Sequence, residues 1–350
     1  MTVLWWARRT LLPCMFGAAV LALIVGGIGP ANGAECKNRG DLDKRYCDDN
    51  DDLVADTPKE TSRQSDPDTL VFSYTPVEDP SVYENVFKEF MDYLGKKTGK
   101  PVKWYGADSY AAQVEAMRSG RLHVAGIAAG ATVFGVNLGG FVPVALMGRK
   151  DGTFGYKLQL ITQADSSINR VSDLKGKKVA HVTPSSNSGH QAPKALFQAL
   201  GVVPDKDYKV TFSGKHDNSI MGVANKDYDA APIASTVLDR MVARGVVDRS
   251  KLRVIWESQL FPSTAYGFAH NLKPDLQKKV AEAFLTFDWK GTMLAKEFKD
   301  VEKFIAISYK DAWVDIRTIQ KVNDTKYTDD ALKALKAPKV KKKEPEKKKS

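Results

Sequence analysis

Short runs of β-branched and aromatic residues alternate along the chain with longer stretches in which apolar residues recur every three or four positions. The first run, Thr69–Tyr74, reads TLVFSY and predicts a strand. Residues 81–99 place Val82, Val86 and Phe90 on one face and end in a lysine-rich turn with glycine, which predicts a helix. Helices fill most of the intervals between further predicted strands at 101–106, 122–128, 156–162, 177–182, 208–214, 228–234, 252–256 and 264–270.

This repeated alternation over about 250 residues is typical of the α/β class. It predicts parallel sheets with helices on both faces. Ligands of such sheets bind at the carboxyl ends of the strands. The loops after Tyr74, Val182, Phe212 and Trp256 should therefore lie on the functional side of the molecule, and all of them contain polar residues suited to an anion.

The charge of the chain is concentrated at its ends. The protein has 350 residues, 43% hydrophobic and 27% charged, with a formal net charge of +10. Residues 1–34 contribute +2, and residues 333–350 contribute +7 from nine lysines and two glutamates, which leaves +1 for everything between. A near-neutral body lacks the sustained basic face that nucleic-acid binding needs, so we exclude a nucleic acid as partner.

Residues 1–34 have the pattern of a signal peptide: Arg8 and Arg9, an uncharged apolar stretch, and small residues before position 35. An uncleaved membrane anchor is the alternative, although the apolar stretch is short for a span. Export implies an oxidising compartment, the periplasm, in which Cys36 and Cys47 should form a disulfide. No Cys/His spacing typical of a metal site is present, so we predict no metal and no cofactor.

Two segments outside the predicted strands and helices carry few apolar residues. Residues 35–68 are rich in Asp, Lys, Arg and Ser, and we interpret them as an exposed lead-in that the disulfide staples locally. Residues 333–350 form a Lys/Glu/Pro tail that cannot bury apolar surface, so we expect it to be disordered. Such a tail is either simply solvated or weakly attracted to anionic lipid headgroups.

Hydroxyl and amide side chains cluster before the helix predicted near residue 190. The sequence PSSNSGH contains Ser185, Ser186, Asn187, Ser188 and Gly189. The start of a helix offers unpaired N–H groups and a partial positive charge, so it can bind a phosphate-like group without any lysine or arginine. Hydroxyl and amide groups add donors, and the glycine allows close approach. An ordinary N-cap uses the same residue types, and spacing alone leaves both readings open.

Three stretches together resemble the phosphate/phosphite/phosphonate periplasmic binding proteins of ABC importers: VSDLKGKKVAHVTPSSNSGHQAPKALFQALGVVPDKDY, SGKHDNSIMGVANKDYDAA and LRVIWESQLFPSTAYGFAH. The resemblance implies the type II periplasmic binding fold, with two α/β lobes joined by a two-strand hinge. We expect one lobe at 69–155 plus 266–332 and the other at 156–265. It further implies a monomeric binding protein, not an enzyme, that closes on a phosphorus oxyanion and delivers it to an ABC permease in the inner membrane.

The resemblance also implies site residues. Ser186, Asn187 and Ser188 correspond to the oxyanion pocket of the family, Tyr110 to its pocket tyrosine and His216 to the histidine of its GHD/GHE motif. Taken on their own, Tyr110 could equally be a packing aromatic with a solvated hydroxyl, and His216 a loop histidine at a helix start.

Further site residues are expected without support from a motif. Tyr74 and Thr75 end the first strand, where ligand contact is plausible, and Tyr156 is assigned to the hinge. After strand 122–128, Ala128, Ala129 and Gly130 leave backbone N–H groups available to an oxyanion.

Aminoalkylphosphonate binders of this family hold the ligand's ammonium with carboxylates. Here those places are taken by Ser235 and Thr236, and by Ser263 and Thr264. A buried ammonium without a carboxylate partner costs several kcal/mol, roughly, in desolvation. We therefore expect Thr236 and Thr264 to contact phosphate, phosphite or a short alkylphosphonate, with no fixed cation in the site. The alternative function is a component of a sensory system that presents the ligand with the same lobes. We exclude a hydrolase, because the sequence has neither the G-x-S-x-G nucleophile motif nor a cluster of metal ligands.

Overall fold

The structure is a computed structural model that describes residues 36–335. The predicted signal peptide lies outside these residues, and so does most of the predicted tail, from residue 336 on. The expectation that the tail from 333 on is disordered is wrong for its first three residues, because Lys333 and Ala334 end a helix and Leu335 is buried. No helix within 36–335 has the length and apolar character that crossing a bilayer requires.

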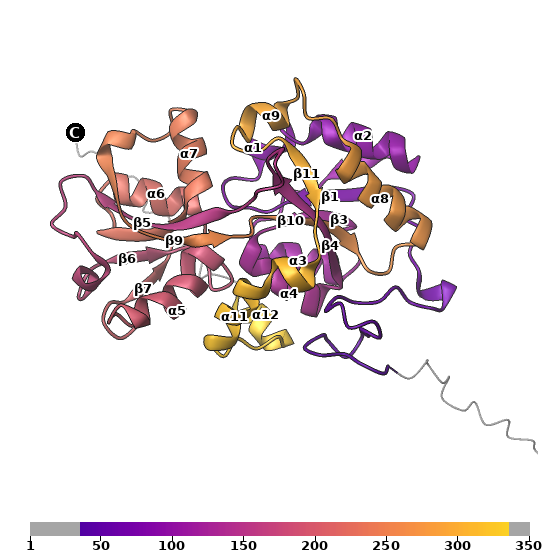
Figure 1. The fold of residues 1–350 in the computed structure, drawn as a ribbon, viewed down its shortest axis with the longest axis horizontal. Helices are drawn as coiled ribbons and strands as arrows, with labels where there is room; N and C mark the ends of the chain where they lie inside the picture. Colours follow the sequence, from indigo (N-terminus) through magenta and orange to yellow (C-terminus); the bar gives the residue numbers. More distant parts are fainter. Residues whose placement is uncertain (1–35, 336–350) are drawn as a thin grey trace, which may run out of the picture. The chain divides into compact units, whose positions relative to one another are not determined.

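Two β-sheets organise the described chain (Figure 1). The six-stranded sheet has the order β11-β4-β10-β3-β1-β2, and we call it with its helices lobe 1. The five-stranded sheet has the order β7-β6-β8-β5-β9 and forms lobe 2. The strands of lobe 1 are β1 (Leu70–Tyr74), β2 (Val102–Trp104), β3 (Val124–Ile127), β4 (Phe141–Gly148), β10 (Ala265–Ala269) and β11 (Lys303–Ala306). Those of lobe 2 are β5 (Tyr156–Gln163), β6 (Val179–His181), β7 (Val210–Phe212), β8 (Ala230–Ala234) and β9 (Leu252–Phe261).

The chain passes between the sheets twice, from β4 to β5 and from β9 to β10. This arrangement is the type II fold that the sequence indicated. The exact lobe boundaries, 69–155 plus 266–332 and 156–265, stay a prediction.

The sheets are mixed, so the prediction of parallel sheets is wrong in part. Strand β1 pairs in parallel with β2 and β3, but β10 runs antiparallel to β3 and β4. Its first residue, Ala265, pairs with Ile127 at the end of β3. Strand β10 returns from lobe 2 and begins beside the carboxyl end of β3. It must therefore run in the direction opposite to β3. In lobe 2, β5 likewise runs antiparallel to β8 and β9.

Helices cover both faces of the sheets. In lobe 1, α2 packs with α8 on one face, and α3 packs with α4 on the other (Figure 1). The helices are α1 (Ser81–Glu84), α2 (Lys88–Thr98), α3 (Tyr110–Arg118), α4 (Ala129–Gly139), α5 (Ala192–Ala199), α6 (His216–Ala224), α7 (Ser235–Ala243), α8 (Pro274–Thr286), α9 (Met293–Glu297), α10 (Tyr309–Ala312), α11 (Val314–Val322) and α12 (Asp329–Ala334). Short 3-10 turns lie at η1 (Thr61–Arg63), η2 (Val171–Leu174) and η4 (Arg249–Lys251), and a π-helical turn at η3 (Asn187–Gln191).

Three local expectations need correction. The single helix expected at 81–99 is two helices, α1 and α2. Strand β9 continues past Trp256 to Phe261, so the loop on the ligand side is 262–264. Sequence periodicity did not indicate α4, because all eleven of its residues are buried and it has no polar face.

The segment before β1 is more buried than its composition suggested. The disulfide between Cys36 and Cys47 is present. Leu42 and Tyr46 are buried, and the Tyr46 hydroxyl donates to the carbonyl oxygen of Leu138 at 3.2 Å. The expectation of an exposed lead-in is therefore wrong for these residues, because a few apolar side chains among many polar ones are enough to fix a segment onto lobe 1.

Candidate functional site

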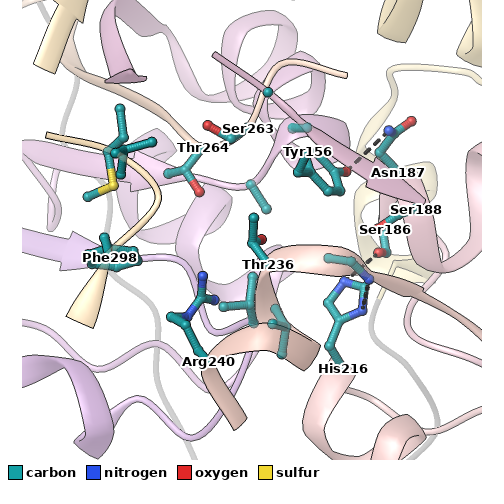
Figure 2. A pocket seen from close by; sticks show the side chains of 18 of the residues that line it. Tyr156, Ser186, Asn187, Ser188, His216, Thr236, Arg240, Ser263, Thr264 and Phe298 are labelled. Atoms are coloured by element: carbon teal, nitrogen blue, oxygen red, sulfur yellow. Dashed lines mark hydrogen bonds between the residues drawn. The ribbon is translucent and has the colours of Figure 1, made fainter. Parts of the chain in front are cut away.

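A cavity of about 70 Å³ lies between the lobes, where several strands end (Figure 2). Lobe 1 contributes the end of β1 and the starts of α3 and α4, and lobe 2 contributes η3, α6 and α7. The polar and charged side chains of its lining belong to Tyr74, Tyr110, Tyr156, Ser186, Asn187, Ser188, His216, Thr236, Arg240, Ser263, Thr264 and Asp300. Apart from the backbone of residues 128–130, eleven residues were expected at the ligand, and eight of them are in this set.

The three remaining predicted residues, Thr75, Ser185 and Gly189, do not line the cavity, and Thr75 is fully buried. Ser185 is fully buried, and its Oγ has no hydrogen-bond partner within residues 36–335. A Cβ at Gly189 would meet the side chain of Val182, the residue after β6, at 2.4 Å, so packing within lobe 2 already requires a glycine here. Close approach of a ligand to Gly189 stays a prediction.

At the start of η3, the N-cap interpretation is confirmed for Ser186, and the oxyanion-site interpretation stays a prediction that Ser188 supports. Ser186 is an N-cap, since its Oγ accepts a hydrogen bond from the Gly189 amide at 3.1 Å. Ser188 has no such local role: it is 1% exposed, and its Oγ has no partner among the described residues. A buried hydroxyl without a partner costs about 1–3 kcal/mol, which a ligand oxygen in the cavity would offset.

Tyr110 faces the same cavity from lobe 1. It begins α3, whose N-cap Ser109 accepts from the Ala112 amide at 3.1 Å. The side chain is 2% exposed, and burial raises the pKa of its phenol well above the usual value. The hydroxyl therefore stays protonated, and it too has no partner within the described chain. It is a second donor without an acceptor.

Tyr156 directly follows the crossing segment between β4 and β5, so its assignment to the hinge stays a prediction. It begins β5 and lines the cavity. Asn187 donates from Nδ2 to the Tyr156 hydroxyl oxygen at 3.3 Å (Figure 2). Since that oxygen accepts from Asn187, the phenolic hydrogen is free to point elsewhere. Its position at the first residue of a predicted strand gave no signal of this role.

His216 is a neutral donor. Its Nδ1 accepts a hydrogen bond from the Ala234 backbone amide at 3.2 Å, and an amide nitrogen can only donate there. The single proton of the neutral ring is therefore on Nε2. Burial and, as the smaller cause, the charge of Arg240 lower the pKa of His216 to about 3. Nε2 lies 3.5 Å from Ser186 Oγ, beside the helix start.

Arg240 is a residue that the sequence analysis missed. It lines the cavity from α7, and its residue exposure is 8%. It contradicts the expectation that the site has no fixed cation. A signal existed, because Arg240 follows Thr236 by four residues and therefore lies on the same helical face. This relation was overlooked because the helix was interpreted only by its apolar residues, Val237 and Met241.

The starts of two helices from different lobes meet beside the cavity. A Cβ at Gly130, the second residue of α4, would lie 2.2 Å from the carbonyl oxygen of Ser185 and 2.7 Å from the amide nitrogen of Asn187. The first amides of a helix have no acceptor within it. Ala128 and Ala129 line the cavity as well. Both helix starts thus present partial positive charge to the same small volume.

The lining is not polar throughout. Val77, Met147, Phe298 and Val301 contribute apolar side chains to it, and Phe298 lies across the cavity from Ser186 and Ser188 (Figure 2). The carboxylate of Asp300 also lines the cavity, but this residue is exposed. The lining therefore combines hydrogen-bond donors with apolar side chains.

The described residues offer no plausible metal centre. In residues 36–335, the acid, His and Cys side chains that come close enough to share an ion are those of Cys36, Cys47 and Asp49. Both sulfurs are used in the disulfide and cannot coordinate an ion.

Comparisons with known proteins agree with this geometry. Residues 72–313 match the family model described as the periplasmic substrate-binding protein of phosphonate ABC transporters. The chain is 30% identical over 241 residues to the phosphate-import protein PhnD of Mycolicibacterium smegmatis, covering 66% of this chain and 75% of that protein. These relatives are transporter components that bind substrates and are not enzymes.

Two solved structures support the fold. A binding protein component of an ABC phosphonate transporter from Pseudomonas aeruginosa aligns with a TM-score of 0.67 at 24% identity, covering 74% of this chain and 88% of that chain. PhnD1 of Prochlorococcus marinus, solved with methylphosphonate, aligns with a TM-score of 0.66 at 19% identity, covering 74% and 100%.

Proposed function

Because the chain belongs to the family of periplasmic substrate-binding proteins of phosphonate ABC transporters, we propose that it captures a small phosphorus oxyanion between its lobes. Residues 1–34 direct export, and the loaded protein, a monomer, delivers the anion to an ABC permease in the inner membrane. The relatives' own ligands differ, since one imports phosphate and another was solved with methylphosphonate. The choice among phosphorus oxyanions therefore rests on this chain's own residues.

One observation carries the proposal: buried hydrogen-bond donors from both lobes line one small cavity, and two of them have no acceptor. Ser188 Oγ and the Tyr110 hydroxyl are unpaired among the described residues, and they come from different lobes. Neutral His216 lines the same cavity, with its protonated Nε2 3.5 Å from Ser186 Oγ. An oxyanion has several lone pairs on each oxygen and satisfies all of these donors at once.

The ligand carries no ammonium group. Thr236, Ser263 and Thr264 line the cavity at positions where a carboxylate would be needed to hold one. The carboxylate that does line it, Asp300, is exposed, and water screens it. Phosphate, phosphite and short alkylphosphonates fit this lining, with Met147 and Phe298 able to contact an alkyl group.

Binding proceeds by closure of the lobes. Tyr110 is in lobe 1 and Ser188 in lobe 2, so an anion that contacts both stabilises only the conformation in which they approach. The two crossing segments, β4–β5 and β9–β10, are where the movement would be absorbed. Tyr74, Thr236 and Thr264 complete the contacts from the two sides.

The test is a ligand panel on protein purified from the periplasmic fraction and freed of bound ligand by unfolding and refolding. Thermal shift and calorimetry compare phosphate, phosphite, methylphosphonate, aminoethylphosphonate and sulfate. We expect one of the amine-free phosphorus oxyanions to give the largest shift. A larger shift with aminoethylphosphonate contradicts the ligand assignment, and no shift with any phosphorus compound contradicts the function.

Substitution of Ser188, measured with the same ligands, tests whether the start of η3 is part of the binding site. Ser188→Ala should weaken binding by about 1–3 kcal/mol, which is the loss of one buried donor to a charged acceptor. Ser167→Ala is the matched control, because Ser167 is an exposed serine of lobe 2 outside the cavity lining. Equal affinities of the two variants would remove the start of η3 from the binding site.

A further inference from the structure

The guanidinium of Arg240 belongs to a cluster of four charges that joins the lobes. Arg240 and Arg244 come from lobe 2, and Glu78 and Glu297 from lobe 1. Arg240 lies 3.6 Å from Glu78 and 3.6 Å from Glu297. Arg244 lies 3.0 Å from Glu297 and also pairs with Glu78, whose other oxygen accepts from the Tyr83 hydroxyl. The formal charges of the cluster sum to zero.

The cluster nevertheless presents a positive end to the cavity. Arg240 is the member of the four that lines it, whereas Glu78, Glu297 and Arg244 do not, within the described chain. Figure 2 shows the guanidinium pointing from α7 toward Thr236 and Phe298. A charge at the cavity wall with its counter-ions behind it acts on a bound anion at short range, where little water screens it.

The N–H groups of Arg240 are not used up by its contacts with the two carboxylates. Both of its carboxylate contacts are ion-pair distances longer than a hydrogen bond, because Arg244 holds the same carboxylates more closely. Nε lies nearest to Glu297 and Nη2 nearest to Glu78, neither at hydrogen-bonding distance, and Nη1 is in neither of these two ion pairs. The face of the guanidinium is held by Phe298, whose ring centre is 5.2 Å from Cζ. The side chain is thus held in place, but some of its N–H donors have no acceptor.

We propose that Arg240 is a ligand-binding residue that gives the site its fixed positive charge and favours doubly charged oxyanions over singly charged ones. Its N–H groups donate to an oxygen of the anion held by Ser188, Tyr110 and His216. This inference rests on the proposed function and goes beyond it, because neutral donors alone would not distinguish the two charge states strongly.

The experiment compares Arg240→Gln and Arg240→Lys with Arg244→Gln, a control from the same cluster that does not line the cavity. Calorimetry with phosphate and with methylphosphonate is run from pH 5.5 to 8.5, across the second ionisation of each ligand. We expect Arg240→Gln to raise Kd by about 10- to 100-fold at pH 8 and to flatten the gain in affinity with pH. Arg240→Lys should keep part of that gain, and Arg244→Gln should change Kd less than about threefold.

A double variant separates ligand contact from a purely structural role. Arg240→Gln combined with Glu78→Gln restores the charge balance of the cluster but not the cation in the cavity, so binding should stay weak. Recovery of wild-type affinity in this variant, or an equal loss in Arg244→Gln, would overturn the inference. Wild-type Kd and pH profile in both Arg240 variants would overturn it too, while leaving the proposed function in place. Failure of the wild type to bind any phosphorus oxyanion would overturn both.

Discussion

Replacing Gly130 with alanine tests whether the two lobes must approach closely to hold the ligand. Gly130 is in lobe 1, at the start of α4, and a Cβ there would lie 2.2 Å from Ser185 O and 2.7 Å from Asn187 N in lobe 2. Both neighbours are backbone atoms, so rotation of a side chain cannot relieve the contact. The chain can avoid it by separating the lobes or by shifting η3 away from α4.

The expected change in Kd depends on whether the clash arises in the ligand-bound or the ligand-free form. Inserting a methyl group into packed surroundings costs about 1–3 kcal/mol. If ligand binding requires the close approach, this cost falls on the bound form, and Kd should rise by about 5- to 150-fold. The free energy of unfolding of the ligand-free protein should fall by less than this, because separation of the lobes relieves the contact.

Gly139→Ala is the matched control on the same helix. A Cβ at Gly139 would meet its nearest neighbour, the carbonyl oxygen of Val114, at 3.4 Å, which is an ordinary contact. Both variants are measured by calorimetry with the preferred ligand of the panel and by urea unfolding without ligand. A Gly130→Ala protein that binds as tightly as Gly139→Ala would refute the reasoning, because the lobes would then not need this approach.

Two further results are expected for stability. Burial lowers the pKa values of His181, His190 (to about 4) and His216 (to about 3), so below pH 6.5 the unfolded chain takes up protons that the folded chain excludes. The free energy of unfolding should therefore fall as pH falls from 6.5 to 4, by up to about 1.4 kcal/mol per pH unit for each histidine, and a urea midpoint that is constant over this range would contradict it. Opening the disulfide with Cys36→Ser and Cys47→Ser removes a constraint of about 3 kcal/mol from the segment before β1. Hydrogen exchange of the Asp43 amide, which donates to Asn137 O at 2.8 Å, should accelerate, and unchanged protection would show that the packing of the segment does not depend on the bond.

Much of the binding site could be predicted because its residues are next to each other in the sequence. Ser186, Asn187 and Ser188 lie within one helix start, and the polarity of that stretch is visible in the sequence alone. Tyr110 and His216 each begin a helix on the ligand side of a lobe, as the alternation of strands and helices and the family resemblance together indicated.

The residues that were missed are those whose roles depend on a distant part of the chain. Arg240 reads as a charged residue on an amphipathic helix until lobe 1 brings Glu78 and Glu297 against it. Tyr156 reads as the start of a strand until η3 places Asn187 beside its hydroxyl. The crowding of Gly189 by Val182, the residue after β6, likewise depends on the fold.

The sequence by itself determined the family, the two-lobed α/β class and the helix start rich in donors, because local patterning and short motifs specify these. Tertiary structure alone decided the direction of β10, the charge of the cavity wall and which hydroxyls are left without partners. These depend on the segments that cross between the lobes, and a local pattern contains no information on which distant groups a crossing segment will bring into contact.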